Sequence, residues 1–277
     1  MSDPVEKKLF DAAWDGRASE VSSLLRDHPE INVNWSKEGS GWTSLHAASR
    51  NGRVEVVKLL LAHPNIDVNM KSSNGNTPFS LGCLCGQVSV VQVLLKDPRV
   101  NTTLDDNDGR TPLWYASFNG GIEVVEWLIA SSRDLGDFMN KKGKDVRKDY
   151  TALEIARKNQ RSEVVSVLER FIANPAQTRY ELRVKLGVLD PLVSEVFALT
   201  VFLCDNLLQL KPAAPAITPT AAVATRFFTI IKRLPMELQM ILCHCAVGST
   251  KQNILRKDSE VAFKSLARIL LDSQFEL

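Results

Sequence analysis

The side chains best suited to metal binding or redox chemistry are five cysteines and four histidines. Two short runs, Cys83-Leu84-Cys85 and Cys243-His244-Cys245, bring thiol and imidazole groups close together. A structural zinc site takes four such ligands, commonly from pairs separated by two to four residues. Neither run has that spacing, and the two runs lie far apart in the chain. The pattern therefore predicts no metal site and no cofactor.

Nucleophilic catalysis needs a serine or cysteine positioned beside a histidine. The histidines are His28, His46, His63 and His244, and both His28 and His63 stand directly before a proline. The sequence contains no nucleophile-elbow motif and no glycine-rich phosphate loop. We therefore predict no catalytic residues and no enzymatic activity.

The charge balance gives no reason to expect a nucleic acid or a membrane as partner. Lysine and arginine total 34 and aspartate and glutamate total 32, for a formal net charge of +2. Apolar runs such as Val196 to Leu199 are far shorter than the roughly 20 residues that span a bilayer. The odd number of cysteines and the polar start favour a reducing compartment. We expect a cytoplasmic protein, with the nucleus as the alternative.

A recurring phrase indicates which elements carry these side chains. Thr43, Thr77 and Thr111 each open a similar segment and are 34 residues apart, and Thr151 opens a fourth after 40. A period of this length is typical of stacked units that bury apolar surface against their neighbours. Apolar residues at helical spacing follow each phrase, so we predict an all-α solenoid.

Each unit also carries signals for where its helices begin and end. Thr77 and Thr111 can cap a helix, because each is followed by a proline that fits the first helical position. Thr151 and Glu154 have the spacing of a capping box. Glycines stand where the first helix must end and the chain reverse, except in the last unit. These turn residues are Gly52, Gly86, Gly120 and, in the last unit, Gln160.

The repeated Gly-x-Thr-Pro-Leu-His-x-Ala pattern, followed by Glu-Val-Val-x-x-Leu-Leu, resembles the ankyrin-repeat family. The resemblance runs from about Lys8 to Phe171. It implies an ankyrin-repeat solenoid of five units, each with two antiparallel helices and a projecting finger loop. The first unit, about Glu6 to Val33, lacks the opening phrase and is divergent. In this family the residue at the position of His46 ties neighbouring fingers together by hydrogen bonds.

Composition divides the chain further. We predict a repeat domain over residues 1–173, capping helices over 174–210, a Pro/Ala/Thr linker over 211–225 and a helical tail over 226–277. A lysine-rich insertion, about residues 133–148, separates the last two units. It is either a solvated loop or a loop that contacts a partner or an anion.

The tail contains a short string that resembles the start of an F-box, a segment that tethers substrate receptors to a cullin ubiquitin ligase. The resemblance implies contacts with a ligase adaptor. The residues concerned are Leu234, Pro235, Glu237, Leu238 and Leu242. A Leu-Pro start is equally typical of an ordinary helical cap, so a plain cap or a dimerisation element remains open.

The ankyrin resemblance implies a protein partner, held on the concave face by finger tips and first helices. Trp42, Leu84 and Phe118 are the expected apolar anchors, because buried aromatic groups inside a polar rim make energetic hot spots. The full set of expected contact residues is Trp42, Arg50, Asn51, Asn76, Leu84, Arg110, Tyr115, Phe118 and Asn119. The sequence thus favours a non-catalytic protein-interaction module. The alternatives are a ligase adaptor and a structural or self-assembling module.

Overall fold

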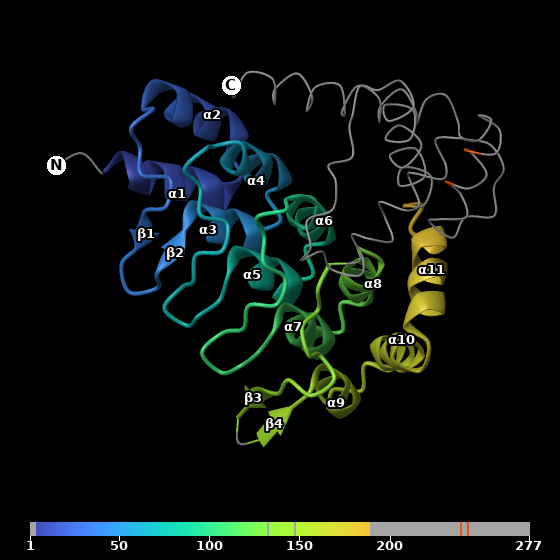
Figure 1. Cartoon of the computed structure of the whole chain (residues 1–277). Coiled ribbons are helices and arrows are strands. Elements are labelled where there is room, and N and C mark those ends of the chain that lie inside the picture. Colours follow the sequence, from blue (N-terminus) through green and yellow to red (C-terminus); the bar gives the residue numbers. More distant parts are fainter. Residues whose placement is uncertain (1–3, 132, 147, 189–238, 240–242, 244–277) are drawn as a thin grey trace, which may run out of the picture. The chain divides into compact units, whose positions relative to one another are not determined.

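The computed structural model describes residues 4–131, 133–146, 148–188, 239 and 243, and within them the chain is dominated by helices (Figure 1). The chain divides into two compact units, Met1–Leu182 and Arg183–Leu277, and the repeat fold belongs to the first. Its helices are α1 (Val5–Asp15), α2 (Ala18–Asp27), α3 (Ser44–Arg50), α4 (Val54–Leu61), α5 (Pro78–Leu84), α6 (Val88–Lys96), α7 (Pro112–Asn119), α8 (Ile122–Ala130), α9 (Ala152–Lys158) and α10 (Ser162–Ala173). Helix α11 (Pro175–Lys185) crosses the boundary between the two units.

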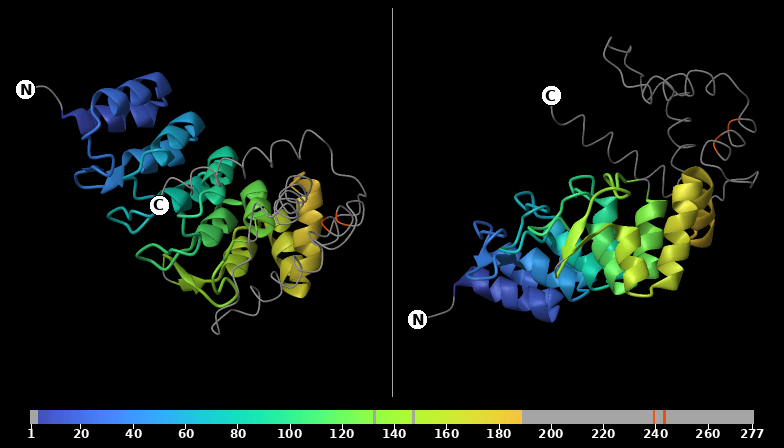
Figure 2. Two further views of the ribbon diagram at one scale, coloured as in Figure 1. Left: turned by 45° about the horizontal axis from the view of Figure 1, so that its top comes forward. Right: turned by 90° about the horizontal axis from the view of Figure 1, so that it is seen from below.

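The ten helices α1 to α10 form five antiparallel pairs, which confirms the all-α solenoid of five units. The first helices α1, α3, α5, α7 and α9 contact one another in that order. The second helices α2, α4, α6, α8 and α10 form a parallel row behind them. Figure 2 shows the successive pairs side by side. Each unit therefore buries its apolar surface against its neighbours rather than around one centre.

The predicted caps are present. Thr43, Thr77, Thr111 and Thr151 are the N-cap residues of α3, α5, α7 and α9, and each hydroxyl accepts a main-chain N–H three residues ahead. Three of these caps are full capping boxes, including the predicted pair of Thr151 and Glu154.

The predicted turns also form. Gly52, Gly86 and Gly120 have φ values of 70°, 67° and 80°, the left-handed conformation that reverses the chain. Gln160 adopts the same conformation with a φ of 57°. The packing of the last unit therefore imposes a turn that its residue type disfavours.

The core lies between the two helix rows. Branched apolar side chains of the second helices, such as Val57, Leu94 and Val125, are fully buried there. In the second to fourth units, the position three residues before the turn glycine holds a small side chain with no exposed surface: Ser49, Cys83 or Ser117. Close helix packing requires small side chains at this position.

Two short antiparallel hairpins lie in the finger region. Strand β1 (Ser36–Lys37) pairs with β2 (Trp42–Thr43), and β3 (Gly143–Asp145) pairs with β4 (Lys148–Tyr150). The second hairpin occupies the end of the predicted 133–148 insertion. That segment is therefore a finger with local structure rather than only a solvated loop.

Helix α11 begins where the predicted capping region begins, after the last repeat. Within the first unit it packs on α8 and α10 through Arg179, which donates to the main-chain carbonyl of Ile129 and lies over the ring of Phe171. The second predicted capping helix, the linker and nearly all of the tail lie outside the described residues. None of the described helices is long and apolar enough to cross a bilayer.

Candidate protein-binding face

One position of every first helix points its side chain outward. It lies two residues before the turn residue of each unit, and its five occupants differ completely in chemistry. They are Trp14, Arg50, Leu84, Phe118 and Lys158, all exposed or half-buried. Together with Trp42 and Tyr150, which directly precede two of the capping threonines, we call them the first-helix face.

The face begins with a stack of aromatic rings. The Trp42 ring lies on that of Trp14, with centroids 5.9 Å apart and an angle of 28° between the planes. The guanidinium of Arg50 lies over the Trp42 ring, 5.1 Å from its centroid. Trp14 is 41% exposed, a large value for an indole, and was missing from the predicted contact set. Trp14 stands two residues before Gly16, as Arg50 stands two residues before Gly52. This spacing identifies Trp14 as a residue of the same position in the repeat.

Leu84 and Phe118 are half-buried at the middle of the face, where the sequence placed them as anchors. Both pack against a buried cluster of Trp114, Tyr115 and Ile155. Phe118 lies almost parallel to Trp114, with centroids 5.3 Å apart and an angle of 12° between the planes. The cluster holds the Phe118 ring in place with part of its surface uncovered.

Tyr115 is a correction to the predicted contact set, because its side chain is only 5% exposed. Its hydroxyl donates to Asp106, a buried carboxylate that also accepts the main-chain N–H groups of Asp108 and Arg110. Burial, together with the Asp106 hydrogen bond, raises the pKa of Tyr115 to about 12. Tyr115 therefore stabilises the finger of its own unit and is not available to a partner.

Asn76 is a second correction, because it is buried at the base of its finger. Its main-chain carbonyl accepts the Nε2–H of His46 at 2.9 Å, which ties the second finger to the third. Trp114 makes the equivalent contact two units further along, between the fourth and fifth units, since its indole N–H donates to the Tyr150 carbonyl at 2.9 Å. The tie between fingers expected at His46 is thus present, and Asn76 is its acceptor.

Two further predicted residues, Asn51 and Asn119, tie adjacent units together. Their amide groups donate to the main-chain carbonyls of Trp14 and Leu84, at 3.2 and 3.0 Å. Each of these acceptors belongs to the first helix of the preceding unit, where carbonyls at the helix end lack helical partners. Stacking of the units therefore uses both amide groups, although Asn119 is exposed.

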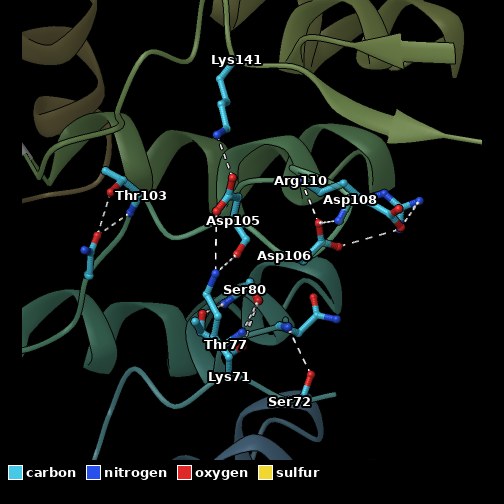
Figure 3. Close-up of polar contacts among 12 residues, drawn as sticks. Lys71, Ser72, Thr77, Ser80, Thr103, Asp105, Asp106, Asp108, Arg110 and Lys141 are labelled. Carbon is cyan, nitrogen blue, oxygen red and sulfur yellow. Dashed lines mark hydrogen bonds and ion pairs between the residues drawn. The ribbon is translucent and has the colours of Figure 1, made fainter. Parts of the chain in front are cut away.

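Arg110 has a similar structural role in the fourth finger. Its Nε–H donates to the Lys144 carbonyl at 2.6 Å. Its guanidinium also pairs with Asp108 at 3.2 Å, as Figure 3 shows. The same guanidinium lies over the Trp114 ring, 5.4 Å from its centroid. These contacts fully engage Arg110 between the fourth and fifth fingers.

A carboxylate also joins three successive fingers, as Figure 3 shows. Asp105 pairs with Lys141 at 2.7 Å and with Lys71 at 3.7 Å. The hydrogen bond from Lys141 lowers the pKa of Asp105 despite partial burial. The lysine-rich insertion is therefore attached to the preceding finger by an ion pair as well as by main-chain contacts.

Cys83 and His46, two of the side chains suited to metal binding or nucleophilic chemistry, are fully buried in the repeat stack. Burial raises the pKa of the Cys83 thiol and lowers the pKa of His46 to about 4, so both are neutral at physiological pH. The residues that the structure describes contain no group of three or more His, Cys, Asp or Glu side chains able to hold a metal ion. The F-box-like residues Leu234, Pro235, Glu237, Leu238 and Leu242 lie outside the described residues.

Comparison with known proteins agrees with the stacked geometry. Two curated relatives of this chain are 2-5A-dependent ribonucleases. The mouse (Mus musculus) protein is 36% identical over 74 residues, 27% of this chain and 10% of the relative. The human (Homo sapiens) protein is 43% identical over 53 residues, 19% of this chain and 7% of the relative. The chain thus spans a tenth or less of these two relatives.

The family model described as ankyrin repeats matches three overlapping stretches, residues 9–103, 65–142 and 95–175. These stretches contain all of the capping threonines and turn residues described above. The comparisons give no support to the F-box-like string. Since the matches extend over more than half of its length, the chain belongs to the ankyrin-repeat family.

Proposed function

We propose that this chain is a non-catalytic module that binds a protein partner through the first-helix face. The observation that carries the proposal is the row of exposed or half-buried apolar groups Trp14, Trp42, Leu84 and Phe118 on one side of the repeat stack. Large apolar side chains that the fold leaves partly exposed at neighbouring positions are typical of an interaction surface. Ankyrin repeats are in general protein-interaction modules without catalytic activity, which agrees with this proposal.

The polar groups around these anchors support binding rather than catalysis. The buried histidine and the buried thiol are engaged in packing, and the exposed cations lie over aromatic rings or pair with carboxylates. The activity named for the curated relatives is not extended to this chain, because the matched segments are only 74 and 53 residues long. A cytoplasmic or nuclear location remains a prediction.

The test compares the full chain with a double variant, Leu84→Ser with Phe118→Ser, as bait for proteins from a cell lysate. We expect the variant to lose the captured partners more than tenfold, because both anchors of the face are removed. Leu61→Ser is the matched control, since Leu61 is a half-buried leucine of α4 in the second-helix row. Thermal unfolding of each protein verifies that the stack is intact.

Two outcomes would contradict the proposal. One is capture of the same partners in equal amounts by the double variant, which would place the site elsewhere. The other is concentration-dependent self-association in light scattering that the double variant abolishes. That result would make the face an interface between copies and favour the self-assembling alternative.

A further inference from the structure

The first-helix face carries the same cation–aromatic pair in the second and the fifth unit. Trp42 and Tyr150 each directly precede a capping threonine, and Arg50 and Lys158 each lie seven residues after that threonine. Arg50 lies over the Trp42 ring at 5.1 Å, and Lys158 lies over the Tyr150 ring at 4.7 Å. Each end of the face therefore carries a cation held on an aromatic ring.

The units between these pairs are different. At the position of Arg50 and Lys158 they carry Leu84 and Phe118, which are half-buried and apolar. Arg110, which corresponds in position to Trp42, already pairs with carboxylates of its own finger. The centre of the face is therefore apolar, with its nearest cation neutralised.

One cation at each end lacks an ion-pair partner among the described residues. Arg50 pairs with none of their carboxylates, and the same holds for Lys148, whose ammonium lies over Tyr150 at 5.3 Å. Lys158, in contrast, pairs with Asp145. A guanidinium stacked on an indole keeps the N–H groups at its edge free, and these match a carboxylate in a two-point contact.

The distance between the two ends limits what can bridge them. Helices in successive units are roughly 8–10 Å apart, so three steps from the second unit to the fifth give about 24–30 Å. An extended chain advances about 3.3 Å per residue. A segment of about seven to nine residues therefore reaches from Arg50 to Lys148.

We propose that the partner segment is an extended peptide with an apolar centre and acidic residues at both ends. One carboxylate contacts the Arg50 guanidinium on Trp42, the apolar centre covers Leu84 and Phe118, and the other carboxylate contacts Lys148 beside Tyr150. This inference rests on the proposed function and gives its partner a charge pattern. Charge complementarity at the ends sets the position of the segment on the face, and the apolar centre provides most of the affinity.

A single-stranded nucleic acid also combines negative charge with groups that stack on aromatic rings. The face fits it less well, because the Trp42 ring is already covered by Trp14 and Arg50. The observations therefore favour a peptide.

The experiment measures fluorescence anisotropy of a labelled peptide titrated with the full chain. The probe has two glutamates at each end and about six leucine, alanine and serine residues between them. One comparison peptide has lysine in place of every glutamate, and another has the same composition with the glutamates in the centre. We expect the acidic-ended probe to bind at least tenfold more tightly than either comparison, with affinity that falls as salt is added.

Single-charge variants locate the contacts. Arg50→Gln and Lys148→Gln should each weaken binding of the acidic-ended probe roughly three- to tenfold, the range for one exposed charged contact. Lys96→Gln is the matched control, because Lys96 is an exposed lysine of α6 in the second-helix row. It should change the affinity by less than about twofold. Arg50→Lys should keep part of the affinity, since it retains the charge but not the planar fork.

Several results would overturn the inference. One is that the lysine-ended peptide binds as tightly as the acidic-ended probe. Another is that Lys148→Gln and Lys96→Gln change the affinity for the probe by the same factor. A third is that a ten-nucleotide oligoribonucleotide displaces the probe at a lower concentration than the unlabelled peptide does. Absence of binding by every peptide would also overturn it. The proposed function would survive that last result if Leu84→Ser with Phe118→Ser still abolished partner capture, so the two failures are distinguishable.

Discussion

Acidification should destabilise the repeat stack through one buried histidine, His46. Its side chain has no exposed surface, and the Thr43 main-chain N–H donates to its Nδ1 at 3.1 Å. Its Nε2–H donates to the Asn76 carbonyl at 2.9 Å, so only the neutral ring with the proton on Nε2 satisfies both contacts. A proton on Nδ1 would face the Thr43 N–H and break the capping box of α3.

The magnitude follows from the pKa. Burial lowers the pKa of His46 from its ordinary value of 6.5 to about 4. The unfolded chain therefore binds a proton that the folded chain refuses at any pH between these values. The stability that this neutral ring provides is complete above pH 6.5 and is lost as the pH falls toward 4. At about 1.4 kcal/mol per unit of pKa, the loss is about 2 kcal/mol at pH 5 and about 3 kcal/mol at pH 4.

Urea unfolding at pH 7.5 and pH 5 measures this difference. His46→Ser removes the titrating group but copies Ser80, whose hydroxyl accepts the Thr77 N–H at 2.9 Å in the next unit. We expect this variant to have a lower free energy of unfolding than the native chain at pH 7.5. Its own free energy of unfolding should change little between pH 7.5 and pH 5. His63→Gln, which removes a histidine outside this network, should keep the native drop.

The urea titrations stop at pH 5 because paired carboxylates begin to lose their contribution to stability at lower pH. Asp97 and Asp105 also have a lowered pKa, but their contribution is intact until the pH approaches their ordinary value of 3.8. If His46→Ser loses as much stability between pH 7.5 and pH 5 as the native chain does, the reasoning about His46 is refuted.

Three further predictions concern backbone turns and the buried tyrosine. Gly120→Ala should lower the free energy of unfolding by about 1 kcal/mol, because Gly120 has a φ of 80° that alanine disfavours. Gly121 has a φ of −72°, so Gly121→Ala should leave the free energy of unfolding unchanged or slightly higher in the same urea titration. Gln160→Gly should raise the unfolding free energy by up to about 1 kcal/mol, since glycine relieves the left-handed conformation; a lower thermal midpoint would contradict this. Tyr115→Phe should cost about 1–2 kcal/mol by removing the hydrogen bond to Asp106, yet leave partner capture unchanged, and reduced capture by a folded variant would restore Tyr115 as a contact residue.

The sequence predicted the main-chain path well because its signals are local. A threonine that caps a helix, as Thr77 does, acts within four residues, and so does a turn glycine such as Gly86. The turn at Gln160 shows that these signals reinforce a path which packing also enforces. Where one unit lacks the preferred residue, its neighbours still impose the same conformation.

Side-chain exposure was predicted less well because it depends on contacts between fingers and between units. Tyr115 stands at a position that the resemblance placed in the face, but Asp106 draws its hydroxyl inward. The Asn51 amide donates to a carbonyl of the preceding helix, a contact that no single repeat displays. Trp14 was missed because its unit lacks the threonine phrase, although its spacing from Gly16 identifies it.

These contacts explain why one position of the first helix is free to vary. The residue just before the turn is an asparagine that ties units together in three of the five, namely Asn51, Asn119 and Asn159. The residue two places earlier is small and fully buried in the second to fourth units. The side chain between them makes no hydrogen bond to the preceding unit and is never fully buried, and a tryptophan, an arginine, a leucine, a phenylalanine and a lysine all occupy this position. All five units form the same helix pair with these different side chains, although Leu84 and Phe118 also pack on the Trp114 cluster. Under the proposed function, this is therefore the position where side-chain chemistry can match a partner at the least cost to the fold.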